Sequence, residues 1–201
     1  MWKGRVREGW QMARPRNQTR DQDAIAATRE LLATVGYHGF SMNDVARTIG
    51  SSKNTLYRRW PSKASLVAAS ITEKSTNEVA AYPSLRDALI ALAQSHLCAE
   101  DGHSIPVLAG VFWAMRADQE LADVVRREIA ETRLTEFHQA LQSAQQRGEL
   151  ADVPPHWRQI GQLLPAALMY RFAVDQPIDG NSLVQIIDTI LLPLIHDSTC
   201  Q

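Results

Sequence analysis

The sequence predicts an all-α protein, with a small N-terminal unit of three helices followed by a larger helical domain. Apolar residues recur at spacings of three and four over most of the chain, and Gly or Pro interrupts the rhythm between segments. No stretch alternates apolar and polar residues as a half-buried strand would. Residues 41–63 read as two short helices joined by a glycine, an arrangement that helix-turn-helix units share.

The first three helices are expected to end before Pro61. Residues 23–35 carry apolar side chains in helical rhythm, and Gly36 follows them. Ser41 can cap a second helix, with Asp44 at the capping-box position, and Gly50 can close it in a left-handed conformation. Ser52 can cap the third helix, residues 53–60, which the proline then stops.

The third helix is expected to divide into two faces. Leu56 and Trp60 lie four residues apart and can share an inward face. The outward face then offers hydrogen-bonding groups of the kinds that contact DNA in a major groove. We predict that Lys53, Asn54, Tyr57 and Arg58 contact base edges, and that phosphates are contacted by Ser41, Ser52, Thr55, Arg59 and Lys63. A solvated amphipathic hairpin is the plainer alternative.

The stretch GSSKNTLYRRWPSKASLV resembles the tetracycline-repressor (TetR) family of bacterial transcription regulators. The family's spacing is matched by Gly50, Ser52, Thr55, Leu56, Tyr57, Trp60, Lys63 and Leu66. Ser51 departs from it, because an apolar residue usually stands there. The resemblance implies that Lys63 grips a phosphate, and that a fourth helix from about Ala64 to the late seventies links the DNA-binding unit to the larger domain.

Charge divides the chain into a basic part and an acidic part. Residues 1–63 hold twelve Lys and Arg against five Asp and Glu, whereas residues 64–201 hold nine against seventeen. The net charge of -1 therefore conceals a basic end, which suits a polyanionic partner such as double-stranded DNA. We expect a basic, disordered arm at 1–20, a helix-turn-helix domain at 21–65 and a helical domain at 66–201.

Two further expectations concern the ends and the location of the chain. Met12 is as good a start as Met1, so residues 1–11 need not belong to the native protein. Two cysteines, no secretion signal and no long apolar run predict a cytoplasmic protein that does not engage a membrane.

The larger domain is expected to contain five further helices, at residues 84–99, 105–115, 121–147, 157–172 and 183–195. Pro165 and Pro193 lie inside apolar segments and predict kinks or early helix ends there. The resemblance implies that the last two helices form a homodimer interface, with Leu164, Leu168, Ile187, Leu191 and Leu194 as its candidate residues.

The resemblance also implies a pocket for a small-molecule effector that releases a dimeric repressor from a palindromic operator. Trp113 and Phe137 are the favoured lining residues, within a candidate set of His96, Phe112, Trp113, Met115, Arg116, Phe137, His138 and Tyr170. Each of these is commonly a core residue instead. The sequence indicates neither the ligand nor the operator.

Other classes of protein find less support. No nucleophile with its base and no acid/base pair is evident, so neither an enzyme nor a cofactor is predicted. His96, Cys98, Glu100, Asp101 and His103 could hold a metal in a metal-sensing regulator, but their spacing matches no known ligand pattern. A helical adaptor without a ligand is the remaining alternative.

Overall fold

The computed structural model describes residues 16–72, 81–97 and 104–197, and all of its regular structure there is helical. The first helices are α1 (Arg16–Val35), a 3-10 turn η1 (Tyr37–Gly39), α2 (Met42–Thr48), α3 (Lys53–Arg59) and α4 (Lys63–Ile71). The rest are α5 (Leu85–Leu97), α6 (Ser104–Ala114), α7 (Gln119–Val125), a π segment η3 (Arg126–Ala130), α8 (Glu131–Gln146), α9 (Trp157–Ala173), α10 (Gly180–Ile186), a second π segment η4 (Ile187–Leu191) and α11 (Leu192–Asp197). The all-α prediction is confirmed for these residues.

The first four helices begin at the residues that local chemistry dictates, with one exception, whereas α4 ends at Ile71, before the late seventies that were expected for it. Ser52 caps α3 and Ser62 caps α4, each side chain accepting a backbone N–H three residues later. Ser41 and Asp44 form the predicted capping box of α2. The exception is α1, which begins at Arg16 rather than near residue 23. Residues 16–20 are thus helical, which corrects the expectation of a disordered arm for that part.

The turn between α2 and α3 is a Schellman motif. Gly50 has φ +60°, its N–H donates to the Arg47 carbonyl over 3.2 Å, and the Ser51 N–H donates to the Ala46 carbonyl over 2.9 Å. The unusual Ser51 therefore bonds through its backbone N–H, which any residue other than proline could also do. Closure of α2 depends on the glycine.

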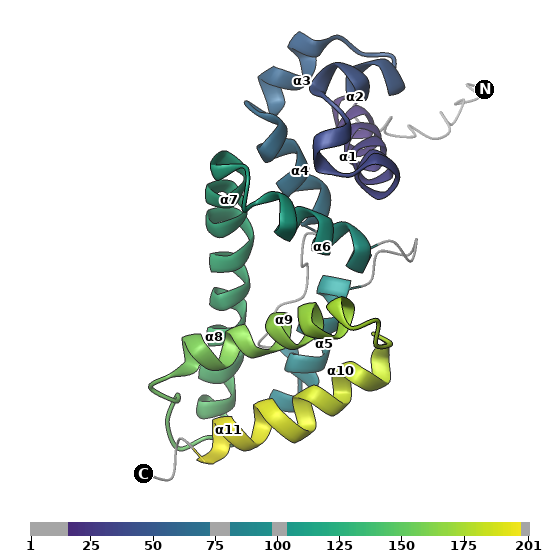
Figure 1. Cartoon of the computed structure of the whole chain (residues 1–201). Helices are drawn as coiled ribbons and strands as arrows, with labels where there is room; N and C mark the ends of the chain where they lie inside the picture. Colours follow the sequence, from purple (N-terminus) through teal and green to yellow (C-terminus); the bar gives the residue numbers. More distant parts are fainter. Residues whose placement is uncertain (1–15, 73–80, 98–103, 198–201) are drawn as a thin grey trace, which may run out of the picture.

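The larger predicted domain divides between two hydrophobic clusters. One cluster joins side chains of α1–α4 with α6 and α7, including Val111 of α6 and Leu121, Val124 and Val125 of α7. Figure 1 shows α6 and α7 directly against the end of the molecule that α1–α4 form. By packing, α6 and α7 therefore belong with the DNA-binding helices, although the predicted domain limit lies far before them at residue 66.

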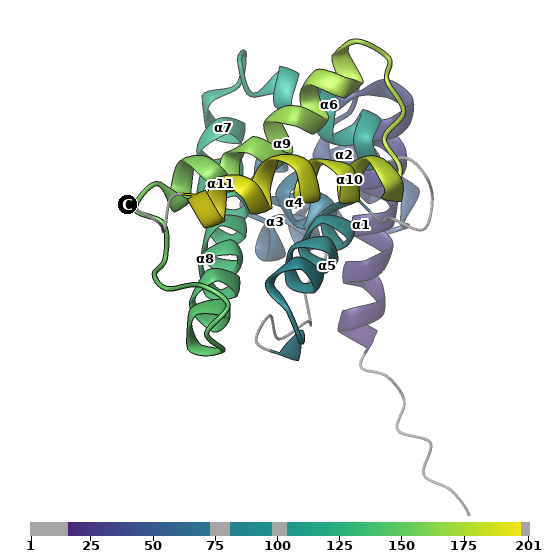
Figure 2. The same cartoon turned by 90° about the horizontal axis from the view of Figure 1, so that it is seen from below.

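The second cluster comprises α5, α8, α9 and the α10–α11 segment. Arg86 of α5 forms a two-pronged ion pair with Asp188 of η4, over 2.7 and 2.8 Å, and the Glu149 carboxylate accepts the Leu85 N–H at the start of α5. Gly161 lets α9 lie close to α8, because a Cβ there would stand 2.9 Å from Cδ1 of Phe137. In Figure 2, α9 and the α10–α11 segment cross the face seen from below.

Neither proline ends its helix, which corrects the predicted early ends. Pro165 lies inside α9, which continues to Ala173. Pro193 lies in the first turn of α11, directly after the π segment η4. A π turn shifts the local hydrogen-bond register, which accommodates a residue that has no N–H to donate. Among the described helices, none is long and apolar enough to span a membrane.

A pair of glycine substitutions tests the role of the α2–α3 turn. Gly50→Ala should lower the free energy of unfolding by about 1 kcal/mol, because alanine is strained at positive φ although no atom lies within 4 Å of the added Cβ. The matched control is Gly110→Ala inside α6, which also has open space and should raise stability by up to about 1 kcal/mol. Urea denaturation measures both. A Gly50→Ala variant as stable as Gly110→Ala would contradict the account.

Candidate nucleic-acid interface and internal cavity

The face of α3 that points away from the core carries the predicted DNA-contacting side chains. Leu56 is buried and Trp60 packs partly against the first cluster, as the spacing predicted. The opposite face exposes Lys53, Asn54, Tyr57, Arg58 and Arg59. Lys53 Nζ lies 5.4 Å from the centroid of the Tyr57 ring. A cation, an amide, a phenol and two guanidinium groups therefore share one short, solvent-facing helix.

Three predicted phosphate contacts are hydroxyl groups at helix starts, where Ser41 and Ser52 are N-caps and Thr55 lies in the first turn of α3. Ser52 Oγ accepts the Thr55 N–H over 3.2 Å and lies 2.8 Å from Thr55 Oγ1. Ser41 Oγ donates to Asp44 Oδ2 over 2.7 Å, and with the Ser41 N–H it lowers the pKa of that carboxyl. Ser41 and Ser52 thus cap helices in the described chain, and the phosphate contacts of all three residues stay a prediction.

The Arg59 side chain is paired within the domain. Its Nε donates to Asp21 Oδ1 of α1 over 2.9 Å, and its NH2 contacts the other carboxylate oxygen. Both side chains remain partly exposed, 42% for the arginine and 29% for the aspartate. The pair ties the end of α3 to α1 and offsets part of the positive charge at that end of the α3 face.

Lys63 lies inside the DNA-binding unit rather than on the α3 face. Its ammonium donates to the Phe40 carbonyl over 2.8 Å and also to the Tyr37 carbonyl. The rings of Tyr37 and Phe40 lie with centroids 4.1 and 4.5 Å from Nζ. Burial lowers the pKa of this lysine, against the opposing effect of Asp118 and Asp44. A phosphate contact would require the ammonium to exchange these bonds.

Tyr37 links the DNA-binding helices to α7. Its hydroxyl donates to Asp118 Oδ2 over 2.8 Å, and its ring is almost fully buried. Burial, and then the bonded carboxylate, raise the pKa of the tyrosine. Asp118 is also the N-cap of α7, where Oδ1 accepts the Leu121 N–H over 2.9 Å. That backbone bond, helped by the Tyr37 hydroxyl, keeps the pKa of Asp118 below its ordinary value.

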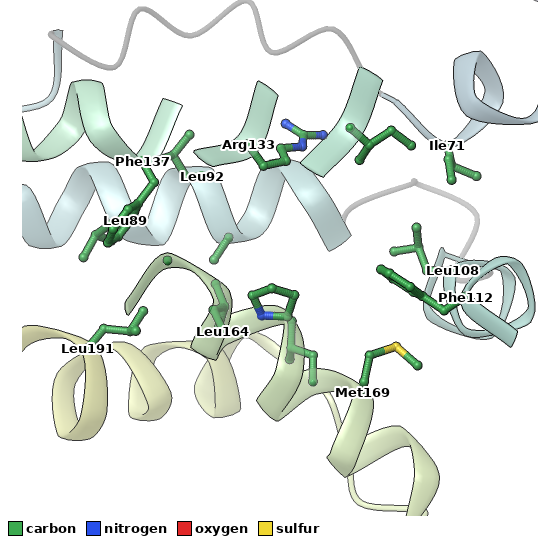
Figure 3. A pocket seen from close by; sticks show the side chains of 15 residues that line it. Ile71, Leu89, Leu92, Leu108, Phe112, Arg133, Phe137, Leu164, Met169 and Leu191 are labelled. Carbon is green, nitrogen blue, oxygen red and sulfur yellow. The ribbon is translucent and has the colours of Figure 1, made fainter. Parts of the chain in front are cut away.

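A cavity of about 180 Å³ lies where the two hydrophobic clusters meet. Figure 3 shows walls from α5 and α8 on one side, α9 opposite them and α6 at one end. The end of α4 reaches it through Ile71. Its lining is Ile71, Leu89, Leu92, Ala93, Leu108, Phe112, Ile129, Arg133, Phe137, Gly161, Leu164, Pro165, Leu168, Met169 and Leu191. An apolar wall with one charged side chain is suited to a small, mostly apolar ligand.

Two of the predicted ligand-binding residues line the cavity, and the others that the structure describes do not. Phe112 and Phe137 line the cavity, but Trp113 does not, and 65% of its surface is exposed. Tyr170 is 66% exposed, and Arg116 is also on the surface. Met115 packs on the first cluster, and His138 stacks on Trp157 with ring centroids 4.3 Å apart. The His96 side chain lies outside the described part of the chain.

The structure contradicts two of the five predicted interface residues, Ile187 and Leu191, and leaves the partly exposed Leu164 and Leu168 untested. Ile187 and Leu191 are buried in the chain's own core, and Leu164 and Leu168 face the cavity. Leu194 alone of the five is largely exposed, at 41%. Helical rhythm identifies apolar residues but does not say which of two opposite rows faces inward. The large apolar side chains exposed on α9, at its C-cap and on the α10–α11 segment are Leu163, Tyr170, Val174, Ile190 and Leu194.

Comparison with known proteins matches both parts of this architecture. Residues 24–70 match the family described as bacterial regulatory proteins, tetR family, and residues 79–190 match the tetracyclin repressor-like C-terminal domain. The chain belongs to the tetR family. It is therefore a DNA-binding transcriptional regulator, and α2 and α3 form the helix-turn-helix of that family.

Individual relatives agree with the family. A DNA-binding transcriptional repressor TetR of Mycobacteroides abscessus is 32% identical over 186 residues, which cover 90% of this chain and 96% of the relative. A helix-turn-helix regulator of Mycobacterium tuberculosis is 31% identical over 184 residues, or 90% of each chain. The fatty acid degradation regulator FadR of Bacillus halodurans shares the fold, with a TM-score of 0.65, 19% identity and coverage of 85% of this chain and 97% of that one.

The hypothesis of a metal site in this tetR-family chain falls largely outside the described residues. The structure does not describe four of its residues, Cys98, Glu100, Asp101 and His103. Within the described ranges, no cluster of three or more potential metal ligands occurs. The features of the site that the sequence analysis did not predict are the hydrogen bond between Tyr37 and Asp118, and the position of Arg133 in the cavity wall. The sequence does contain a signal for Arg133. It stands four residues after Ile129 and four before Phe137, so it is a charged residue within an otherwise apolar helical row.

Replacing Lys63 separates a structural role from a phosphate contact. Lys63→Met should lower the free energy of unfolding by about 1–3 kcal/mol, because it leaves the Tyr37 and Phe40 carbonyls without their donor. Lys53→Met removes the same charge from the exposed face, so it should leave stability within about 0.5 kcal/mol of the parent while weakening DNA binding. A stable Lys63→Met protein with a reduced salt dependence of DNA binding would instead support the phosphate contact.

The buried Tyr37 hydroxyl predicts a difference in alkaline stability. Because the folded state raises the pKa of Tyr37, its stabilising effect is complete below the ordinary tyrosine pKa of about 10 and is lost as pH rises above that value. Tyr37→Phe lacks this titration. The difference in the free energy of unfolding between the parent protein and Tyr37→Phe should therefore become smaller above about pH 10. Denaturation at a series of pH values measures it. A constant difference would show that the hydroxyl does not carry the effect.

Proposed function

We propose that this tetR-family regulator is a dimeric repressor that binds a palindromic operator and leaves it when a small molecule fills the internal cavity. The observation that carries the proposal is the position of the cavity, between the cluster that holds the DNA-binding helices and the cluster that holds α9 to α11. The Mycobacteroides abscessus relative, named a transcriptional repressor, supports the direction of regulation. An operator-binding role in a bacterium implies a cytoplasmic location.

At the DNA, α3 is the helix that enters the major groove. We assign base edges to Lys53, Asn54, Tyr57 and Arg58, which are exposed together. We assign phosphates to Arg59, to the N-cap residues Ser41 and Ser52, and to Thr55. Phosphate contacts position the helix without reading sequence. Arg59 would contact a phosphate while it remains in its ion pair with Asp21. Lys63 then contributes mainly by holding the Tyr37–Phe40 segment against α4.

We assign the dimer interface to the exposed side of α9 and of the α10–α11 segment, in place of the buried residues predicted from the sequence. Leu163, Tyr170 and Val174 follow one another at spacings near multiples of 3.6 and are 37%, 66% and 45% exposed. Ile190 and Leu194 are each 41% exposed on the neighbouring segment, four residues apart. A two-fold dimer through this surface would place two α3 helices on successive major grooves, about 34 Å apart.

The proposed release mechanism depends on helices that both line the cavity and pack with the DNA-binding unit. Ile71 ends α4, and Leu108 and Phe112 belong to α6, so two helices packed with the DNA-binding unit also line the cavity. A ligand that fits better when these helices are displaced favours the state with wrongly spaced α3 helices. Only its difference in affinity for the two states drives release, typically about 1–3 kcal/mol.

Operator selectivity tests the DNA assignment. With an operator selected by the protein from randomised DNA, Asn54→Ala should change the order of preference among operator variants, because it removes a reader of base edges. Arg59→Met should weaken all variants alike and reduce the salt slope by about one. Fluorescence anisotropy at several salt concentrations measures both. The assignment is wrong if the two variants change affinity in the same pattern.

The oligomeric state tests the partner surface. Tyr170→Glu places a charge on the exposed row of α9 and should yield monomers with weak operator binding, as judged by light scattering and anisotropy. Val35→Glu is the matched control, because Val35 is a similarly exposed apolar side chain at the end of α1 and should stay dimeric. A Tyr170→Glu protein that remains a dimer with full affinity would remove this surface from the proposal.

A further inference from the structure

We propose that the cavity binds a molecule with an apolar body and one carboxylate, and that Arg133 holds the carboxylate. The inference rests on the proposed effector role of the cavity. Arg133 is the one charged side chain among the lining residues, and the others are apolar side chains, a proline and a glycine. Such a lining excludes ligands with many polar groups, since those groups would lose their hydrogen bonds to water without replacement.

The position of Arg133 indicates an anionic group on the ligand. The side chain is only 17% exposed, and it occupies the inward row of η3 and α8 between Ile129 and Phe137, which also line the cavity. A guanidinium is charged at every ordinary pH and carries five N–H donors. A cationic ligand would be repelled there. A purely apolar ligand would cover the donors with nothing to accept them, at a cost in affinity.

Glu136 holds the guanidinium without using up its donors. NH1 donates to Glu136 Oε2 over 3.1 Å, which is a pair between successive turns of α8. Arg133 belongs to the cavity wall and Glu136 does not. The acid thus reduces the cost of burying the cation and restrains it, while the planar fork remains suited to a second, incoming carboxylate.

The shape of the cavity orients the ligand. In the view of Figure 3 the Arg133 guanidinium lies on the side of α5 and α8, toward Ile71, and away from Leu164 and Met169 of α9. The carboxylate would therefore sit toward the end of α4, with the apolar body along α9. The charged contact is then made next to the helix that leads to the DNA-binding unit.

A comparison of decanoate with decanol tests the inference directly. The two molecules share an apolar chain of the same length and differ only in the charged end, which is ionised in decanoate at pH 7. Calorimetry on the full-length protein should show decanoate binding at least about tenfold more tightly than decanol, the equivalent of one charge-assisted hydrogen bond. This measurement needs no substitution, so it holds even if a variant fails to fold.

Two arginine variants complete the test. Arg133→Met should reduce decanoate affinity about tenfold or more and leave decanol unchanged. Arg127→Met removes the same charge from an exposed position of η3 and should change neither. The inference is overturned if decanoate does not bind, if decanol binds as tightly, or if Arg133→Met binds decanoate as the parent does.

Operator anisotropy in the same samples separates this inference from the proposed function. Decanoate that binds through Arg133 without loosening the operator would support the carboxylate site and contradict release by a ligand. Decanol that releases the operator as well as decanoate does would support a ligand-responsive repressor and contradict the carboxylate site.

Discussion

The hydrogen bond from the Tyr37 hydroxyl to Asp118 ties the start of α7 to the helix-turn-helix unit, and both lie in the same hydrophobic cluster. Both partners have a second task, since Tyr37 contributes to the core of the helix-turn-helix unit and Asp118 caps α7. A buried hydroxyl needs an acceptor, and this one is the residue at which α7 begins. The start of α7 is therefore held relative to α1, α2 and α4.

Much of the remaining geometry follows from that anchor. Because α7 continues through η3 into α8, the orientation of α7 places Ile129, Arg133 and Phe137 in the cavity wall. Lys63 stabilises the same region, because its ammonium packs on the Tyr37 ring and donates to the Tyr37 and Phe40 carbonyls. The DNA-binding body is thus α1–α4 with α6 and α7, and the cavity lies along its boundary with α5 and α8–α11.

Local signals predicted the elements well, because caps and turns are set by neighbouring residues. Ser41, Ser52 and Gly50 place α2 and α3 in the sequence and in the structure alike. The inward role of Leu56 was equally readable, since it depends only on helical spacing. The sequence could not show that α6 and α7 pack with the DNA-binding helices, because that depends on contacts such as Tyr37 with Asp118, 81 residues apart.

The site was less predictable for a related reason. Aromatic residues were favoured for the pocket. Phe112 and Phe137 do line it, but Trp113 and Tyr170 are exposed, and leucines of α5 and α9 form much of the wall. An apolar residue in a helix can face a core, a cavity or a partner, and the periodicity is the same in all three cases. A charged residue within an apolar helical row is a more specific signal of a cavity wall, and Arg133 is an example.

Hydrogen exchange measured by mass spectrometry tests most directly whether α6 and α7 belong to the DNA-binding body. If they do, amides in α1, α4, α6 and α7 should open with one common free energy, and Tyr37→Phe should lower their protection together while α5 and α8–α11 keep theirs. The account is contradicted if α6 and α7 exchange with α8 and α9, or if Tyr37→Phe affects only α1–α4.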